Sequence, residues 1–150
     1  MGALSGLRIV EFEGWIAGSL LGMLFADQGA EVVRIARPGD AIYNQAGSHM
    51  LARGKKSLVL DLKRAADREV ALRLASTADI VIENLAPDTL NKLGVGCAVL
   101  RGINPRLVHI RLPGFASDDV THANIAAYEG IIAATLGMFT EINLLKPTFG

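Results

Sequence analysis

Short apolar runs rich in β-branched residues alternate along the chain with longer amphipathic runs, and this alternation restricts the fold more than any single motif. The short runs have the length and composition of buried strands, and they cover residues 8–12, 31–35, 57–60, 79–82 and 107–112. The longer runs predict helices over residues 16–28, 65–77 and 98–102. Because apolar strands separated by helices form parallel sheets with both faces covered, we expect an α/β fold of the Rossmann-like type.

The last strongly apolar run, residues 125–139, predicts a further helix. No repeat or linker divides the chain, and 150 residues is the usual size of one domain. We therefore interpret residues 1–150 as a single Rossmann-like domain. A sheet domain whose sequence stops soon after its most apolar helix is expected to be cut short and to bury that helix by self-association.

Charge and cysteine content exclude several classes of protein. Fifteen basic residues balance fifteen acidic ones without a long run of either sign, so neither nucleic acid nor an anionic membrane is an expected partner. The N-terminal residues lack the basic and apolar segments of a signal peptide, and the most apolar helical stretch, residues 15–26, is too short to cross a bilayer. A single cysteine, Cys97, is interpreted as a small buried side chain, and these features together predict a cytoplasmic protein.

Glycines follow the first predicted strand at a spacing of four, namely Gly14, Gly18 and Gly22. A dinucleotide-binding fold instead has a G-x-G-x-x-G turn at that place. On a helix, a spacing of four puts the glycines on one face, where another backbone can approach closely. The segment RGKKS is not a Walker phosphate loop, because His49 stands where the upstream glycine belongs. Binding of NAD or of a nucleoside triphosphate is therefore not predicted.

Two basic groups are better placed to bind phosphate. Arg37 follows the second predicted strand, at the carboxyl end where open α/β sheets bind their ligands. Arg53, Lys55 and Lys56 flank Gly54 just before the third strand. In an extended segment Arg53 and Lys55 point the same way, and an arginine fork beside a lysine point charge suits phosphate. The alternative is an ordinary solvated turn that enters a strand.

Glu129 is the carboxylate with the most informative surroundings, because it lies among apolar residues in AAYEGIIAA at the start of the last predicted helix. Burial raises the pKa of a carboxyl group, whereas a helix N-terminus opposes that change. The alternative is a carboxylate that only interacts with the helix dipole. His49 and His109 have no metal-ligand spacing, so no metal is expected, and Trp15 is interpreted as a core side chain.

Taken in order, several sequence blocks resemble one family, the family III CoA-transferases (the CaiB/BaiF family), which includes formyl-CoA and carnitine CoA-transferases and the α-methylacyl-CoA racemases. The blocks are LSGLRIVEFEGWIAGSLLGMLFADQGAEVVRIARPGD, RGKKSLVLDLK, ADIVIENLAPDTLNKLGVG and LRGINPRLVHIRLPGF. The resemblance covers essentially all 150 residues. It implies a Rossmann-like domain that binds coenzyme A (CoA), taken from a longer chain that forms an interlocked dimer.

The resemblance also implies which residues form the site. The family contacts CoA through its RGK(K/R)S segment, through an Arg-Pro turn after the second strand and through the Glu-Asn pair after the fourth. These positions correspond to Arg53, Lys55 and Lys56, to Arg37, and to Asn84. The catalytic aspartate of the transferases follows a Gly-Phe turn by about fifteen residues, and Glu129 occupies its place here.

Three departures from the family pattern bear on activity. Glutamate replaces the catalytic aspartate, and a reach altered by about 1 Å can cost on the order of a hundredfold in rate. Ala86-Pro87-Asp88 stands where the family has Arg-Pro-Gly, and Gly18-Ser19 where it has Gly-Pro. The small domain and glycine-rich loop of the family are absent from these 150 residues.

Three hypotheses for function follow. The first is a CoA-transferase that moves CoA between an acyl-CoA and a carboxylic acid through an acyl-carboxylate at Glu129 and then a glutamyl thioester. The second is a non-catalytic module that binds CoA or dimerises, either with itself or with a missing second half. The third is a racemase-like or lyase-like relative in which Glu129 moves a proton beside the thioester.

Overall fold

The computed structural model describes residues 2–12, 14–39, 46–116, 118–125 and 128–139 of the chain. They form five strands and six helices, in the order β1 (Arg8–Phe12), α1 (Ile16–Asp27), β2 (Glu31–Ala36), α2 (Ala46–Leu51), β3 (Lys56–Val59), α3 (Ala65–Ser76), β4 (Ile80–Glu83), α4 (Thr89–Lys92), α5 (Cys97–Ile103), β5 (Val108–Arg111) and α6 (Glu129–Thr135). The described residues fall into two compact units, 1–112 and 113–150.

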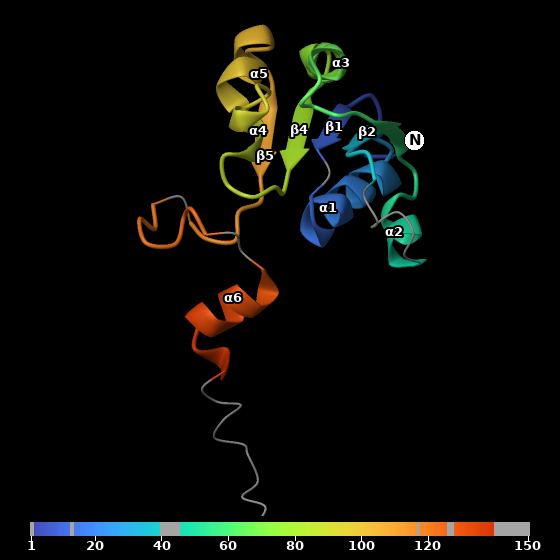
Figure 1. Ribbon diagram of the computed structural model, residues 1–150. Coiled ribbons are helices and arrows are strands. Elements are labelled where there is room, and N and C mark those ends of the chain that lie inside the picture. Colours follow the sequence, from blue (N-terminus) through green and yellow to red (C-terminus); the bar gives the residue numbers. More distant parts are fainter. Residues whose placement is uncertain (1, 13, 40–45, 117, 126–127, 140–150) are drawn as a thin grey trace, which may run out of the picture. The chain divides into compact units, whose positions relative to one another are not determined.

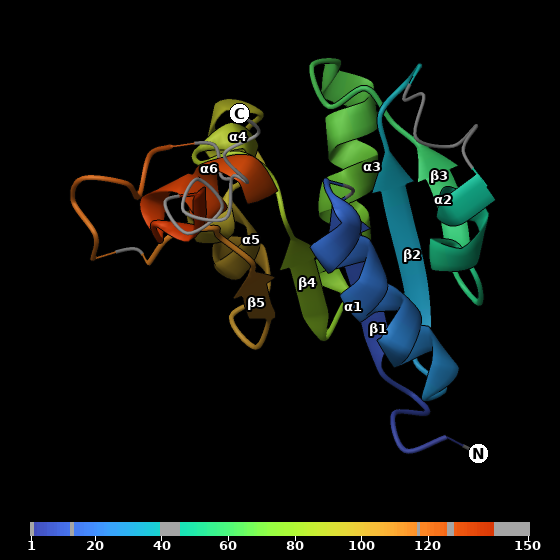
Figure 2. The same cartoon turned by 90° about the horizontal axis from the view of Figure 1, so that it is seen from below.

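The five strands of the described residues belong to one parallel sheet in the order β3-β2-β1-β4-β5, with β1, β2, β4 and β5 labelled in Figure 1 and all five in Figure 2. The chain runs outward from β1 through β2 to β3, then crosses back to β4 on the other side of β1. This reversal of direction beside β1 is the topological switch point at which open α/β sheets bind ligands. The prediction of an α/β fold with a parallel sheet is confirmed.

The alternation of side chains along the strands divides the core between the two faces of the sheet. Ile9 of β1 packs with Val32 and Ile82 and with apolar side chains of α1, which crosses in front of β1 in Figure 2. Val10 and Phe12 belong to a larger cluster on the other face, which takes in buried side chains of α3, α4 and α5. Both faces of the sheet are therefore covered, as near-continuous apolar strands require.

The predicted strands and the helices α1, α3 and α5 are confirmed with boundaries shifted by at most one residue. Two short helices, α2 and α4, were not expected. A helix of one or two turns carries too little periodicity to be recognised from sequence. Part of the helix expected over residues 125–139 is present as α6, and residues 126–127 lie outside the described part of the chain.

The second unit contains α6, and none of the helix's residues is fully buried. Its apolar side chains remain partly open to solvent, with Ile131 37% exposed and Leu136, just after the helix, 71% exposed. Among the described residues, no helix is both long enough and apolar enough to cross a membrane.

Candidate functional site

Asn84 is the polar residue that fixes the carboxyl edge of the sheet. It follows the last residue of β4, and its side-chain oxygen accepts a hydrogen bond of 3.2 Å from the backbone N–H of Trp15. Its side-chain nitrogen donates a hydrogen bond of 2.8 Å to the carbonyl oxygen of Leu112. One half-buried amide therefore joins the segments that follow β1, β4 and β5.

The glycines after β1 allow the backbone near Asn84 to come close. A Cβ at Gly14 would collide with the carbonyl oxygen of Asn84, and a Cβ at Gly18 would lie 2.9 Å from the Cβ of Asn84. The prediction that another backbone approaches these glycines holds in part, because the close neighbour is a backbone at Gly14 and a side chain at Gly18 and Gly22. Only Gly18 and Gly22 lie within α1, because the helix begins at Ile16.

A buried ion pair lies beneath α1. Nζ of Lys55 is 2.6 Å from Oε2 of Glu11, and the two side chains are 0% and 1% exposed. The same ammonium group donates a hydrogen bond of 2.7 Å to the carbonyl oxygen of Ser19, whose hydroxyl donates to Oε1 of Glu11 at 3.1 Å. Burial raises the pKa of Glu11, and the charge of Lys55 opposes that rise. Charge pairing and hydrogen bonds together make the buried charges tolerable.

Sequence reasoning predicted Lys55 as a coenzyme contact and missed Glu11 altogether. In this structure the amino group of Lys55 is occupied by Glu11 and Ser19. The sequence did indicate that Glu11 has a buried partner, because a carboxylate within the otherwise apolar strand RIVEF needs a cation or a proton. Nothing in the sequence indicates which of the chain's cations would approach it.

Arg53 and Lys56 each form an ion pair at the surface. Arg53 holds Asp27 through two contacts, of 3.2 Å from Nε and 2.5 Å from Nη2, and this lowers the pKa of Asp27. Lys56 lies 2.5 Å from Glu31 and lowers the pKa of that carboxyl group. Both cations stay largely exposed, at 57% and 72% of their side-chain surface. They therefore remain accessible to an anionic ligand.

The five predicted coenzyme residues do not form one compact cluster. Arg37 is exposed and follows the carboxyl end of β2, as Asn84 follows that of β4. Lys56 begins β3 and pairs with Glu31, the first residue of β2, so it lies at the opposite end of the strands. The six steps along the chain from Glu31 to Arg37 correspond to about 20 Å at 3.3 Å per residue. A ligand that reached both groups would have to be elongated.

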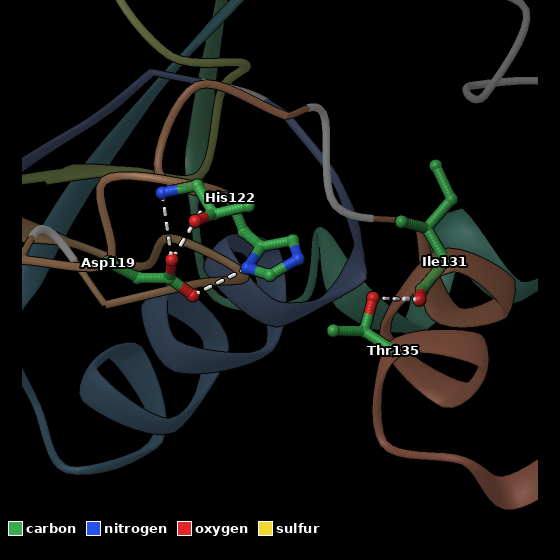
Figure 3. Close-up of polar contacts among 5 residues, drawn as sticks. Asp119, His122, Ile131 and Thr135 are labelled. Carbon is green, nitrogen blue, oxygen red and sulfur yellow. Dashed lines mark hydrogen bonds and ion pairs between the residues drawn. The ribbon is translucent and has the colours of Figure 1, made fainter.

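Glu129 lies in the second unit and is the first residue of α6, with an exposed side chain. The burial suggested by its apolar sequence neighbours is not present, because the side chains of α6 are themselves partly exposed. In the same unit Nδ1 of His122 lies 2.7 Å from Oδ2 of Asp119 (Figure 3), and the ring of Phe115 stacks on the imidazole at 5.2 Å. The hydrogen bond to His122 lowers the pKa of Asp119.

Two expectations about single residues are wrong. Trp15 was expected in the core but is 51% exposed, because it precedes α1 instead of facing the sheet. Cys97 was expected to be buried but is exposed at the first residue of α5. In the described ranges, no group of three or more histidine, cysteine, aspartate or glutamate side chains is arranged to hold a metal ion.

Comparison with known proteins gives a consistent result over nearly the whole chain. Residues 4–143 match the sequence model of CoA-transferase family III. The chain is 40% identical to the CoA-transferase/lyase DddD of Marinomonas sp. strain MWYL1, over 98% of its own length and 18% of the relative's. It is 37% identical to the α-methylacyl-CoA racemase of Mus musculus, over 93% of its own length and 35% of the relative's.

The fold gives the same result. The crystal structure of Rv3272 from Mycobacterium tuberculosis superimposes with a TM-score of 0.82 at 35% sequence identity. The superposition covers 99% of this chain and 42% of the crystallised chain. The chain thus spans less than half the length of these three similar proteins.

Proposed function

Since the chain belongs to the family III CoA-transferases, we propose that it is the CoA-binding part of an enzyme that moves CoA between carboxylic acids. The observation that carries the proposal is the placement of exposed cations at both ends of β2, with Arg37 at one end and Lys56 at the other. A compact nucleotide cannot reach both groups, whereas CoA is elongated and carries phosphates next to a long pantetheine arm.

The proposed division of roles follows from exposure. Arg37, Arg53 and Lys56 are exposed and would bind the phosphates, with Arg53 leaving Asp27 to do so. Asn84 would contact the coenzyme from the edge that its two hydrogen bonds already hold in place. Lys55 would hold the basic segment, residues 53–56, in place, because its ammonium group is buried against Glu11 and bonded to the carbonyl oxygen of Ser19.

Glu129 is the proposed nucleophile. Its carboxylate would attack the carbonyl carbon of an acyl-CoA and release CoA as a thiolate, leaving a mixed anhydride. The thiolate would then attack the glutamyl carbonyl and expel the first carboxylic acid, giving a glutamyl-CoA thioester. The acceptor carboxylate reverses these two steps and leaves as its own CoA thioester. The exposed position of Glu129 on α6 is compatible with attack on an external substrate.

A second function is supported by the 37% identity to an α-methylacyl-CoA racemase. In that case Glu129 would take and return a proton beside the thioester carbonyl and would form no covalent intermediate. Hydroxylamine distinguishes the two, because it converts a glutamyl thioester to a stable hydroxamate at Glu129 and leaves a proton-transfer site unmodified. A hydroxamate formed in the presence of acyl-CoA would exclude the racemase proposal.

The assembled protein and its location are also proposals. We expect a homodimer, or association with a second half, because α6 and its flanks leave apolar side chains exposed. A module that binds CoA without turning it over is the alternative if no such partner forms. A cytoplasmic location is proposed, since CoA thioesters are substrates of that compartment. Sizing chromatography across concentrations tests association, and a strictly monomeric profile would contradict it.

The direct test is calorimetric titration of the chain with CoA. Arg53→Ala should weaken binding by about ten- to a hundredfold, because a hydrogen bond to a charged group contributes about 1.5–3 kcal/mol. Asp27→Asn should strengthen binding, because Arg53 then reaches the phosphates without first leaving its carboxylate partner. Arg73→Ala is the matched control, since Arg73 is exposed in the last turn of α3.

Opposite effects at Arg53 and Asp27, with Arg73→Ala unchanged, would support the proposal. Equal and small effects of all three variants would show that CoA does not bind through this segment.

Lys55→Ala is not a suitable binding probe, because it leaves Glu11 buried without its cation.

A further inference from the structure

Three neighbouring strands reach the carboxyl edge of the sheet side by side. Phe12, the last residue of β1, pairs with Ile35 of β2 on one side and with Glu83 of β4 on the other. Trp15 follows β1, the middle strand of the three. It therefore lies at the switch point of the sheet, where open α/β folds bind their ligands.

Trp15 and Ile16 present apolar side chains to solvent at this edge. Trp15 is 51% exposed and Ile16 is 62% exposed. The backbone of Trp15 is nevertheless held in place, because its N–H donates a hydrogen bond of 3.2 Å to the side chain of Asn84. An exposed indole on a fixed backbone offers a large and rigid contact surface to a ligand.

The surroundings of Trp15 indicate which part of CoA would lie there. Arg37, a proposed phosphate contact, follows the adjacent strand β2. Neighbouring strands are about 4.8 Å apart, so a group attached to a phosphate at Arg37 can reach Trp15. Arg53 and Lys56 lie toward the amino ends of the strands, beside the end of α1 and the start of β2. With the adenosine side of CoA facing those two cations, the part that continues past Arg37 is the pantetheine arm.

We propose that Trp15 packs against the pantetheine arm of CoA, with Ile16 beside it. The inference rests on the CoA binding proposed above and adds a source of selectivity to it. The arm carries two methyl groups on one carbon, which suit the apolar face of an indole. Cations alone bind the phosphates of any nucleotide, whereas an apolar contact to the arm favours CoA over nucleotides that lack it.

Tryptophan fluorescence reports this contact directly, because Trp15 is the single tryptophan of the chain. CoA should shift the emission to shorter wavelength. It should also lower the acrylamide quenching constant by about twofold or more, since half of Trp15 is open to solvent before binding. Adenosine 3′,5′-bisphosphate, which keeps the charged adenosine end but lacks the pantetheine arm, should leave both quantities unchanged. Calorimetry on the same samples measures the binding of each ligand independently.

Variants test the contact through affinity. Trp15→Ala should weaken CoA binding by about tenfold, the loss expected when an aromatic contact is removed, and should leave the affinity for the bisphosphate unchanged. Leu24→Ala is the matched control, because Leu24 is 50% exposed on α1 but lies near the other end of the helix. It should leave both affinities unchanged. If Trp15→Ala fails to fold, the fluorescence of the parent chain decides the matter.

Binding of CoA in the calorimeter without shielding of the indole overturns this inference and leaves the proposed function standing. Failure of CoA to bind in the calorimeter refutes the proposed function and this inference with it. Equal shielding by the bisphosphate would mean that Trp15 stacks on adenine. Shielding that appears on raising the protein concentration alone would mean that a second copy of the chain covers Trp15, and either result overturns the proposal.

Discussion

Replacing Gly22 is the most demanding test of the buried ion pair between Glu11 and Lys55, because the methyl group of an alanine at this position would collide with both side chains. A Cβ built on Gly22 comes closer to Oε2 of Glu11 than real Cβ atoms approach any neighbour. It would also lie 3.0 Å from Cδ of Glu11 and 3.0 Å from Nζ of Lys55. Both partners of a 2.6 Å contact must therefore move away from the helix, within surroundings where their side chains are 0–1% exposed.

Two opposing terms set the expected magnitude. Disrupting a buried ion pair costs about 3–5 kcal/mol when it leaves a charge without compensation. Alanine within a helix gains about 1 kcal/mol over glycine. We therefore expect Gly22→Ala to lower the free energy of unfolding by about 2–4 kcal/mol, a large part of the stability of an ordinary domain. Helix propensity alone predicts the opposite, namely that alanine at this position raises the free energy of unfolding.

Urea unfolding followed by circular dichroism measures this change. Gly102→Ala is the matched control, because Gly102 also lies within a helix and a Cβ there would meet nothing within 4 Å. That variant should be neutral or gain up to about 1 kcal/mol. If Gly22→Ala proves as stable as the parent chain or more stable, the ion pair is not packed against α1 as described, and the argument fails.

The other predictions concern single polar contacts. Lys55→Met should lower the free energy of unfolding by about 3–5 kcal/mol, and Glu11→Leu added to it should restore most of the loss; a double variant as unstable as the sum of the singles would contradict this. Asn84→Ala should cost about 1–3 kcal/mol, because two hydrogen bonds are lost, whereas Asn91→Ala at an exposed position should stay within about 0.5 kcal/mol. Contact with Glu83 raises the folded pKa of His109 above its ordinary value of 6.5, so the stabilising contribution of His109 is full below that value and is lost as the pH rises through the folded pKa. His109→Gln should therefore destabilise the chain more at about pH 5.5 than at about pH 9, and an equal loss at both pH values would refute the assignment.

The central strands β1, β2 and β4 were predictable because they are largely buried. Ile9, Val10 and Phe12 of β1 are all nearly inaccessible, so the strand reads as an apolar run interrupted by Glu11. The amphipathic α3 was equally clear, with Ala71 and Ala75 buried and Arg73 exposed. Helix α4 was missed because it has four residues and follows Asp88, which adopts a left-handed conformation with φ of 64°.

The candidate site was predictable in part. Position in the chain correctly put Arg37 and Asn84 after the carboxyl ends of β2 and β4. It gave no information on side-chain direction, which is why Lys55 was expected to face a ligand when its ammonium group in fact meets Glu11, forty-four residues earlier in the sequence. The same limit concealed the neighbourhood of Cys97, since Cys97 of α5 and His109 of β5 line one cavity that exists only once the sheet has formed.

Asn84 and Lys55 show why residues that shape a site resemble residues that contact its ligand. The amide of Asn84, which is proposed to contact the coenzyme, also joins three chain segments through one donor and one acceptor. An ammonium group can bind a phosphate, but here it neutralises a strand carboxylate. Arg53 differs from both, because its ion pair with Asp27 is exposed and exchangeable. A ligand can therefore displace Asp27 at little cost, whereas a ligand that displaced Glu11 from Lys55 would leave a buried carboxylate without its cation. On this physical ground we propose the phosphate contact for Arg53, and for Lys55 the role of holding residues 53–56 in place.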